Sequence, residues 1–213
     1  AQAETDQPKS GMFALFKHYP KEAFTVLFLT AGGTLAFYTY TTYLQKYLVN
    51  TSGFTKPEAT QITTLALFIF MCLQPVAGAL SDRIGRKPLM IFFGITGVLF
   101  TYVLFDALAN THNYWTAFWL CFGGLVMVTG YTSINAVVKA ELFPAHIRAL
   151  GVALPYAIAN TLFGGTAEFF ALSFKEAGHE SWYFIYVSIM IFISLIIYIF
   201  MKDTKHHSKI KEH

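Results

Sequence analysis

One carboxylate of this chain, that of Glu168, falls inside a long apolar stretch, where a charge is costly. A medium of low dielectric favours the neutral form of a carboxyl group, so Glu168 could take up and release a proton. Lys46, near the end of another apolar stretch, offers an ion pair as the alternative. Proton coupling and a structural or gating ion pair are therefore the two predicted chemistries, and the shallow depth of both residues favours the ion pair.

Hydroxyl and amide groups near the middle of the apolar stretches could bind a carboxylate, because both are hydrogen-bond donors. The candidates are Tyr38, Tyr131, Tyr156 and Asn160. Tyr156, Asn160 and Glu168 are separated by multiples of four residues, which predicts one shared helical face. Ordinary hydrogen bonding between helices is the alternative for each residue, and we expect at least one of the four to contact a substrate.

The ten residues from 78 to 87, GALSDRIGRK, form a charged segment between two apolar stretches. Gly78 and Gly85 would let the backbone turn tightly. Asp82 could cap a helix N-terminus or pair with a guanidinium, while Arg83 and Arg86 could bind carboxylates or lipid phosphates. A merely solvated basic loop would explain the charges but not the glycine spacing, so we expect this segment to bias the protein's conformation.

A second charged group, Lys139, Glu141 and Arg148, lies between two later apolar stretches. We expect these three side chains to form a network on the cytoplasmic side that stabilises one of two conformations. The alternative is that these charges only mark the cytoplasmic face.

Six apolar stretches must position all of these groups. A hydrocarbon core of about 30 Å needs about 20 apolar residues per helix. Charged residues make up only 13% of the chain, and aromatic residues reach 17%. The sequence therefore predicts an all-α integral membrane protein with six spanning helices, at residues 23–49, 58–80, 89–109, 115–138, 149–174 and 183–201.

The positive charges predict the orientation in the membrane. Of the 15 lysines and arginines, twelve lie on one set of connecting segments. Positive loops stay in the cytoplasm, so residues 1–22 are expected to form a cytoplasmic linker and residues 202–213 a cytoplasmic tail, around a bundle at 23–201. The net charge of +3 then reflects topology and indicates no nucleic acid. The chain begins with alanine, and we expect it to be a piece of a longer polypeptide.

Two motifs carry a resemblance to a known family. Residues 78–87 resemble the loop signature G-x-L-x-D-x-x-G-R-K of the major facilitator superfamily, which lies between the second and third helices of a six-helix half. Residues 141–151, ELFPAHIRALG, are similar to the E-x-F-P-x-x-x-R-x-x-G segment between the tenth and eleventh helices of sugar and metabolite:proton carriers. Further similarity at 40–50, 74–82 and 163–168 is to the dicarboxylate branch of the metabolite:proton symporter family.

The resemblance implies the C-terminal half of a twelve-helix fold, with the substrate site between two six-helix halves. It implies proton-coupled symport of a small carboxylate, with 2-oxoglutarate as the first candidate, across a bacterial inner membrane by alternating access. The implied partners are the substrate, protons, the lipid bilayer and an N-terminal half of the same transporter; no cofactor, metal or enzymatic activity is expected. The alternatives are citrate, shikimate or an osmolyte as substrate, or a truncated membrane module that does not transport.

Overall fold

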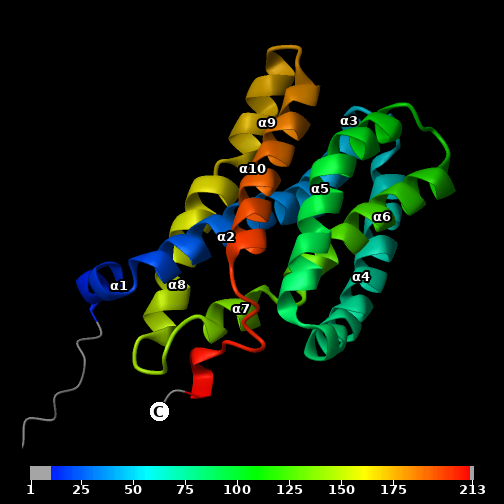
Figure 1. The fold of residues 1–213 in the computed structure, drawn as a ribbon. Coiled ribbons are helices and arrows are strands. Elements are labelled where there is room, and N and C mark those ends of the chain that lie inside the picture. The colour runs from blue at the N-terminus through cyan, green and yellow to red at the C-terminus, as the bar shows by residue number, and fades with distance from the viewer. Residues whose placement is uncertain (1–10, 212–213) are drawn as a thin grey trace, which may run out of the picture.

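The computed structural model describes residues 11–211, and the regular structure of this part of the chain is helical throughout (Figure 1). The elements are α1 (Met12–His18), α2 (Pro20–Tyr38), the π-helix η1 (Thr39–Tyr43), α3 (Leu44–Asn50), α4 (Lys56–Ile84), α5 (Arg86–Ala109), α6 (Tyr114–Thr132), α7 (Asn135–Glu141), α8 (Arg148–Ala159), the π-helix η2 (Asn160–Gly164), α9 (Ala167–Glu176), α10 (Glu180–Phe200) and the 3-10 helix η3 (Lys209–Lys211).

Five continuous stretches within residues 11–211 are long and apolar enough to cross a membrane: Pro20–Asn50, Lys56–Ile84, Arg86–Ala109, Tyr114–Glu141 and Glu180–Phe200. The sixth predicted span, 149–174, is also helical, but it divides into α8, η2 and α9 around a turn at residues 165–166. The all-α prediction is confirmed, and the interruption of this segment is a feature that hydropathy did not predict.

The helices pack into one bundle around buried aromatic rings. Helix α10 packs against α5 and α2, α6 packs against α4 and α5, and α2 also contacts α8. The Tyr40, Phe93, Phe105, Tyr183 and Tyr198 side chains are almost fully buried. Large apolar side chains such as Phe200 and Phe169 are exposed on the outside, as expected of a surface that faces lipid.

The glycine pair in α2 serves close packing. Helix α2 runs through Gly32 and Gly33 without a break. The Gly32 N–H donates to Ser194 Oγ of α10 at 2.9 Å. A Cβ atom at Gly33 would overlap the Tyr131 ring of α6. Only glycine allows these two helices to approach α2 so closely.

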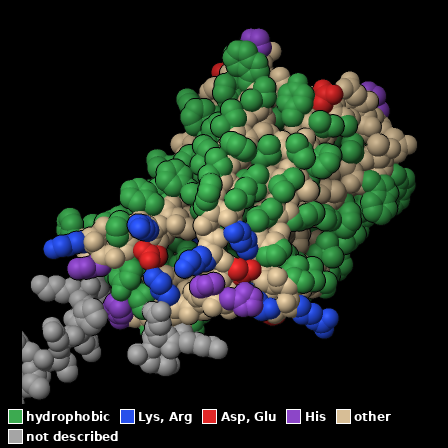
Figure 2. All heavy atoms as spheres, viewed as in Figure 1, with side chains coloured by type: hydrophobic (Ala, Val, Ile, Leu, Met, Phe, Trp, Pro, Cys, Tyr) green, Lys and Arg blue, Asp and Glu red, His purple; other side chains and the backbone are tan. Residues whose placement is uncertain are grey.

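Charged side chains gather at one end of the bundle. Figure 2 shows lysine, arginine and histidine side chains along the lower edge, whereas the middle of this face is mostly hydrophobic. Residues 1–10 of the predicted linker lie outside the described residues, and its described part contains α1. The Leu15 side chain of α1 is buried in a small cluster with Val26, Phe143 and Ile147. This part of the predicted linker therefore packs against the bundle.

Candidate functional site

A buried lysine lies at the centre of the candidate site. Lys139 belongs to α7, which begins after a break in the helical path at residues 133–134. Its side chain is 1% exposed. The Nζ atom donates to Tyr131 Oη at 3.3 Å and to Asn135 Oδ1 at 3.1 Å, and it lies 4.3 Å from the centre of the Tyr156 ring. Among residues 11–211, no carboxylate forms an ion pair with this ammonium group.

Two of the four predicted substrate residues meet at Lys139. Tyr131 is buried on α6, and its hydroxyl contacts the ammonium group directly. Tyr156 of α8 is 42% exposed, so its ring lies between Lys139 and the surface. Asn160 follows Tyr156 by about one helical turn and is exposed at the start of η2. The structure thus groups tyrosine side chains from α6 and α8 around one positive charge.

The fourth candidate, Tyr38, lies beside a different pair of residues. Its hydroxyl is close to Glu168, and within the described part of the chain this buried oxygen has no hydrogen-bond partner. Glu168 of α9 forms an ion pair with Lys46 of α3. Both charged side chains are about half exposed, at 47% and 46%. The structure therefore brings Glu168 and Lys46 together, as the sequence led us to expect, but away from Lys139.

Each partner of this ion pair follows a π-helical segment. Lys46 comes shortly after η1, and Glu168 comes after η2 and a turn. In η2 the Gly165 N–H donates to the Asn160 carbonyl at 2.8 Å, five residues back. Because a π turn holds more residues than an α turn, a spacing of four no longer guarantees one shared face. The single face predicted for Tyr156, Asn160 and Glu168 therefore does not follow from their spacing.

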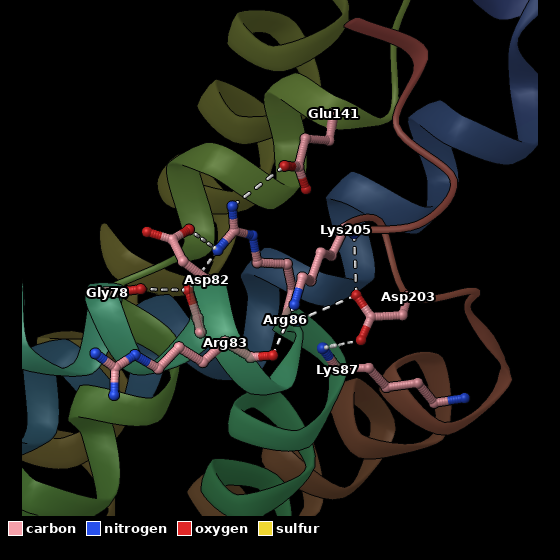
Figure 3. A network of polar contacts seen from close by, with 9 residues as sticks. Gly78, Asp82, Arg83, Arg86, Lys87, Glu141, Asp203 and Lys205 are labelled. Carbon is pink, nitrogen blue, oxygen red and sulfur yellow. Dashed lines mark hydrogen bonds and ion pairs between the residues drawn. The ribbon is translucent and has the colours of Figure 1, made fainter.

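The charged segment at 78–87 is mostly helical. Helix α4 continues to Ile84, so Gly78 lies inside it, and the predicted turn at Gly78 is wrong. The Ser81 hydroxyl bonds the Gly78 carbonyl at 2.7 Å within the same helix. The turn is made at Gly85, whose φ of 104° favours glycine. Figure 3 shows the Arg83 side chain pointing away from the polar network around this turn.

Arg86, the first residue of α5, joins three helices. Its guanidinium donates to Asp82 Oδ1 at 2.5 Å and Ser81 Oγ at 2.6 Å on α4, and to Glu141 Oε1 at 3.5 Å on α7 (Figure 3). The Arg86 and Glu141 side chains are only 11% and 8% exposed, whereas Asp82 is 69% exposed. The contact between Arg86 and Glu141 connects the two motifs that the sequence singled out separately.

The N-terminus of α5 is capped from the C-terminal segment. The Asp203 carboxylate accepts the N–H groups of Arg86 at 3.1 Å, Lys87 at 3.3 Å and Lys205 at 3.0 Å. The Lys205 Nζ atom donates to the Arg83 carbonyl at 2.7 Å. The sequence assigned a possible capping role to Asp82, but Asp203 performs it for α5. Nothing in the local sequence around Asp203 indicates this, because the α5 residues that it caps, Arg86 and Lys87, are more than a hundred residues away.

The predicted network of Lys139, Glu141 and Arg148 is not formed. Glu141 pairs with Arg86, and Lys139 extends towards Tyr131. The Arg148 Nε atom donates to the carbonyls of Ala140 and Phe143, both at 3.1 Å. A cation near the last carbonyls of a helix is stabilising, so Arg148 supports the C-terminus of α7.

A polar cluster at the other end of the bundle was missed by the sequence reasoning. Glu180, the first residue of α10, accepts hydrogen bonds from Tyr43 and Thr51 at 3.0 Å and lies 3.8 Å from Lys175 Nζ. A small pocket of about 30 Å³ lies between this cluster and the ion pair that joins α3 and α9, and it is lined by residues of both. The sequence signal that could have indicated this cluster is Glu180 itself, because an acidic residue at the start of a helix complements the helix dipole.

The comparisons with known proteins agree with this picture. The family described as Sugar (and other) transporter matches residues 2–212. The alpha-ketoglutarate permease of Escherichia coli is 50% identical over 172 residues, which is 81% of this chain and 40% of the permease. The OusA transporter of Dickeya dadantii, named for glycine betaine, proline, ectoine and pipecolic acid, is 26% identical over 95% of this chain and 41% of its own length.

A citrate-proton symporter of Klebsiella pneumoniae is 27% identical over 65% of this chain and 31% of its own length. No solved structure matches the chain. The chain spans about two fifths of the length of the first of these relatives. They are permeases, transporters and symporters, and the expectation that the chain is not an enzyme is confirmed by this family. With its helical bundle and its two motifs, the chain belongs to the Sugar (and other) transporter family of the major facilitator superfamily.

Proposed function

We propose that this chain forms the C-terminal half of a proton-coupled symporter that carries 2-oxoglutarate across a bacterial inner membrane. The observation that carries the proposal is the 50% identity to a protein named alpha-ketoglutarate permease. The relatives named for osmolytes and citrate are more distant, at 26% and 27%. The N-terminal half of the transporter would supply the other wall of a substrate site at the midplane.

The polar residues divide into three proposed roles. Tyr131, Tyr156 and Asn160 contact the substrate from α6, α8 and η2, and Tyr38 extends this surface towards Glu168. The pair of Glu168 and Lys46 acts as a gate, or as the proton site if the pair separates during the cycle. The half exposure of both side chains makes such separation inexpensive, since exposed ion pairs contribute only about 0–1 kcal/mol.

The charged loop residues stabilise one conformation and do not bind substrate in this proposal. Asp82, Arg86 and Glu141 join α4, α5 and α7 at the end of the bundle where positive side chains gather in Figure 2. By the positive-inside rule, this end is cytoplasmic, and both termini lie there.

The test joins the full 213-residue chain to the first six helices of the E. coli permease and measures uptake of labelled 2-oxoglutarate into proteoliposomes. We expect a proton gradient to drive uptake by the joined protein, and we expect no uptake by the 213-residue chain alone. A lone bundle exposes polar groups such as Asn160 that need a partner or water. The intact E. coli permease is the positive control.

Two results would contradict the proposal. Robust uptake by the 213-residue chain alone would show that no second half is needed. A joined protein that inserts but carries citrate, shikimate or glycine betaine in preference to 2-oxoglutarate would assign another substrate, and one that carries none of them would favour a membrane module without transport activity.

A further inference from the structure

We propose that the buried ammonium group of Lys139 binds one carboxylate of the transported solute, and that it selects anions over zwitterionic osmolytes. This inference rests on the proposed transport function and names the group of this half that recognises substrate charge. The sequence gave Lys139 a different role, so the inference comes from where the structure places its side chain.

The first argument is the missing counter-charge. A lysine ammonium group has three donors, and here Tyr131 Oη and Asn135 Oδ1 accept two of them. Both acceptors are neutral, and the side chain is 1% exposed. Burial of an ammonium group without an anion is costly. Glu141, two residues further along α7, pairs with Arg86 instead. The site is therefore built for a negative charge that the described residues do not provide.

The second argument is that an exposed side chain, Tyr156, lies next to the ammonium group. The ammonium group lies 4.3 Å from the centre of the Tyr156 ring, and that ring is 42% exposed. Of the three residues around the ammonium group, Tyr131 is buried, Asn135 is partly buried and Tyr156 is exposed. A shift of the Tyr156 side chain would open a path from the surface to the ammonium group.

The third argument concerns selectivity. An exposed aromatic ring attracts a quaternary ammonium group through its negative face. Here the Lys139 ammonium group already lies over the Tyr156 ring and repels a second cation. A betaine would therefore be disfavoured at this position, whereas a carboxylate would gain a charge-assisted hydrogen bond. The same tyrosine and lysine pair thus favours a dicarboxylate over an osmolyte.

The carboxylate could come from the solute or from an acidic side chain of the proposed N-terminal half, and the experiment distinguishes these sources. We use the joined protein described above and measure exchange of labelled 2-oxoglutarate in vesicles without a proton gradient. Inhibition constants are determined for 2-oxoglutarate, for 2-oxopentanoate and for 4-oxopentanoate. Each of the last two compounds replaces one carboxylate of 2-oxoglutarate with a methyl group. The variants are Lys139→Gln and Lys139→Arg, and exposed Lys17→Gln on α1 is the matched control.

We expect Lys139→Gln to raise the inhibition constant of 2-oxoglutarate at least about tenfold, with one of the two analogues changing less than about threefold. That analogue lacks the carboxylate that Lys139 binds. Lys139→Arg should recover part of the loss, which separates lost charge from misfolding, and Lys17→Gln should leave all constants unchanged. Loss of discrimination against glycine betaine in Lys139→Gln would further support the selectivity argument.

Three outcomes would overturn the inference. An unchanged 2-oxoglutarate constant in Lys139→Gln would show that the charge does not reach the solute. If Lys139→Gln weakens the binding of all three compounds equally, and neutralising an acidic residue of the first half reverses this effect, the carboxylate belongs to the protein. An unmutated joined protein that prefers glycine betaine would contradict the selectivity. The proposed function fails separately if the unmutated joined protein exchanges no 2-oxoglutarate while the intact permease does. Citrate exchange would then be measured, in place of 2-oxoglutarate exchange, to test Lys139.

Discussion

Replacing Asp203 with alanine should open the first turn of α5. The first N–H groups of a helix have no partner within the helix, and the Asp203 carboxylate accepts those of Arg86 and Lys87 at 3.1 and 3.3 Å. It also accepts the N–H of Lys205 at 3.0 Å, which folds the C-terminal segment back onto the loop. The Asp203→Ala variant removes all three hydrogen bonds at once.

The size of the effect follows from these contacts. Loss of an N-capping side chain costs about 0.5–2 kcal/mol, and loss of a negative charge at a helix N-terminus costs about 0.3–1 kcal/mol more. Since Asp203 is partly buried, a combined value of about 2 kcal/mol is reasonable. Local opening of the α5 terminus should then be roughly 30-fold more frequent. Asp203→Asn keeps an acceptor oxygen without the charge and should show a smaller increase.

Hydrogen exchange measured by mass spectrometry on the chain in nanodiscs reports this opening directly. We expect amides of Arg86 and Lys87 to exchange about 30-fold faster in Asp203→Ala, with the middle of α5 unchanged. Asp106→Ala is the matched control, because Asp106 is exposed near the opposite end of α5. Unchanged exchange at residues 86–87, or an equal increase in the control, would refute the capping role.

Three further perturbations test other contacts. Asp82→Asn should reduce uptake by the joined protein while changing its free energy of unfolding by less than about 1 kcal/mol, because Asp82 is exposed; a large loss of substrate affinity would contradict a purely conformational role. Glu168→Gln should impair exchange, and Lys46→Gln added to it should restore part of it; preserved exchange with lost proton-driven accumulation and no repair would identify Glu168 as the proton site. Gly33→Ala should destabilise the bundle by about 1–3 kcal/mol, measured by thermal unfolding, because its Cβ meets the Tyr131 ring, and an unchanged melting temperature would argue against this packing.

Hydropathy predicted the positions of the long helices well, because a span demands one property, apolar length, which can be read from the residues directly. It could not predict where a span is interrupted. The segments η1 and η2 and the turn after η2 contain residues such as Thr39 and Asn160 that also occur in regular α-helices. Segment η2 packs against α2, and such a contact between segments distant in the chain is not visible in the local sequence.

The error at Lys139 has a geometric cause. Lys139 and Glu141 are close in the sequence, but residues i and i+2 of an α-helix point in directions about 200° apart around the helix axis. One side chain therefore points towards Tyr131, and the other towards Arg86. The error at Gly78 is of another kind: α4 continues through this glycine to Ile84, and the Ser81 hydroxyl donates to the Gly78 carbonyl within the same helix.

The distribution of stabilising contacts indicates which parts of the bundle can move. Helices α4, α5 and α7 are joined by the buried contacts of Arg86, and α5 is also capped by Asp203, so they resist separation. The contact between α3 and α9 depends on a half-exposed ion pair, and each helix is preceded by a π segment. Tyr156 on α8 and Glu168 on α9 belong to one segment, joined through η2 and the turn at residues 165–166. We therefore expect a shift that separates Glu168 from Lys46 to displace the Tyr156 ring beside Lys139 as well. Under the proposed transport function, this segment would link the gate to the binding site, as an alternating-access cycle requires.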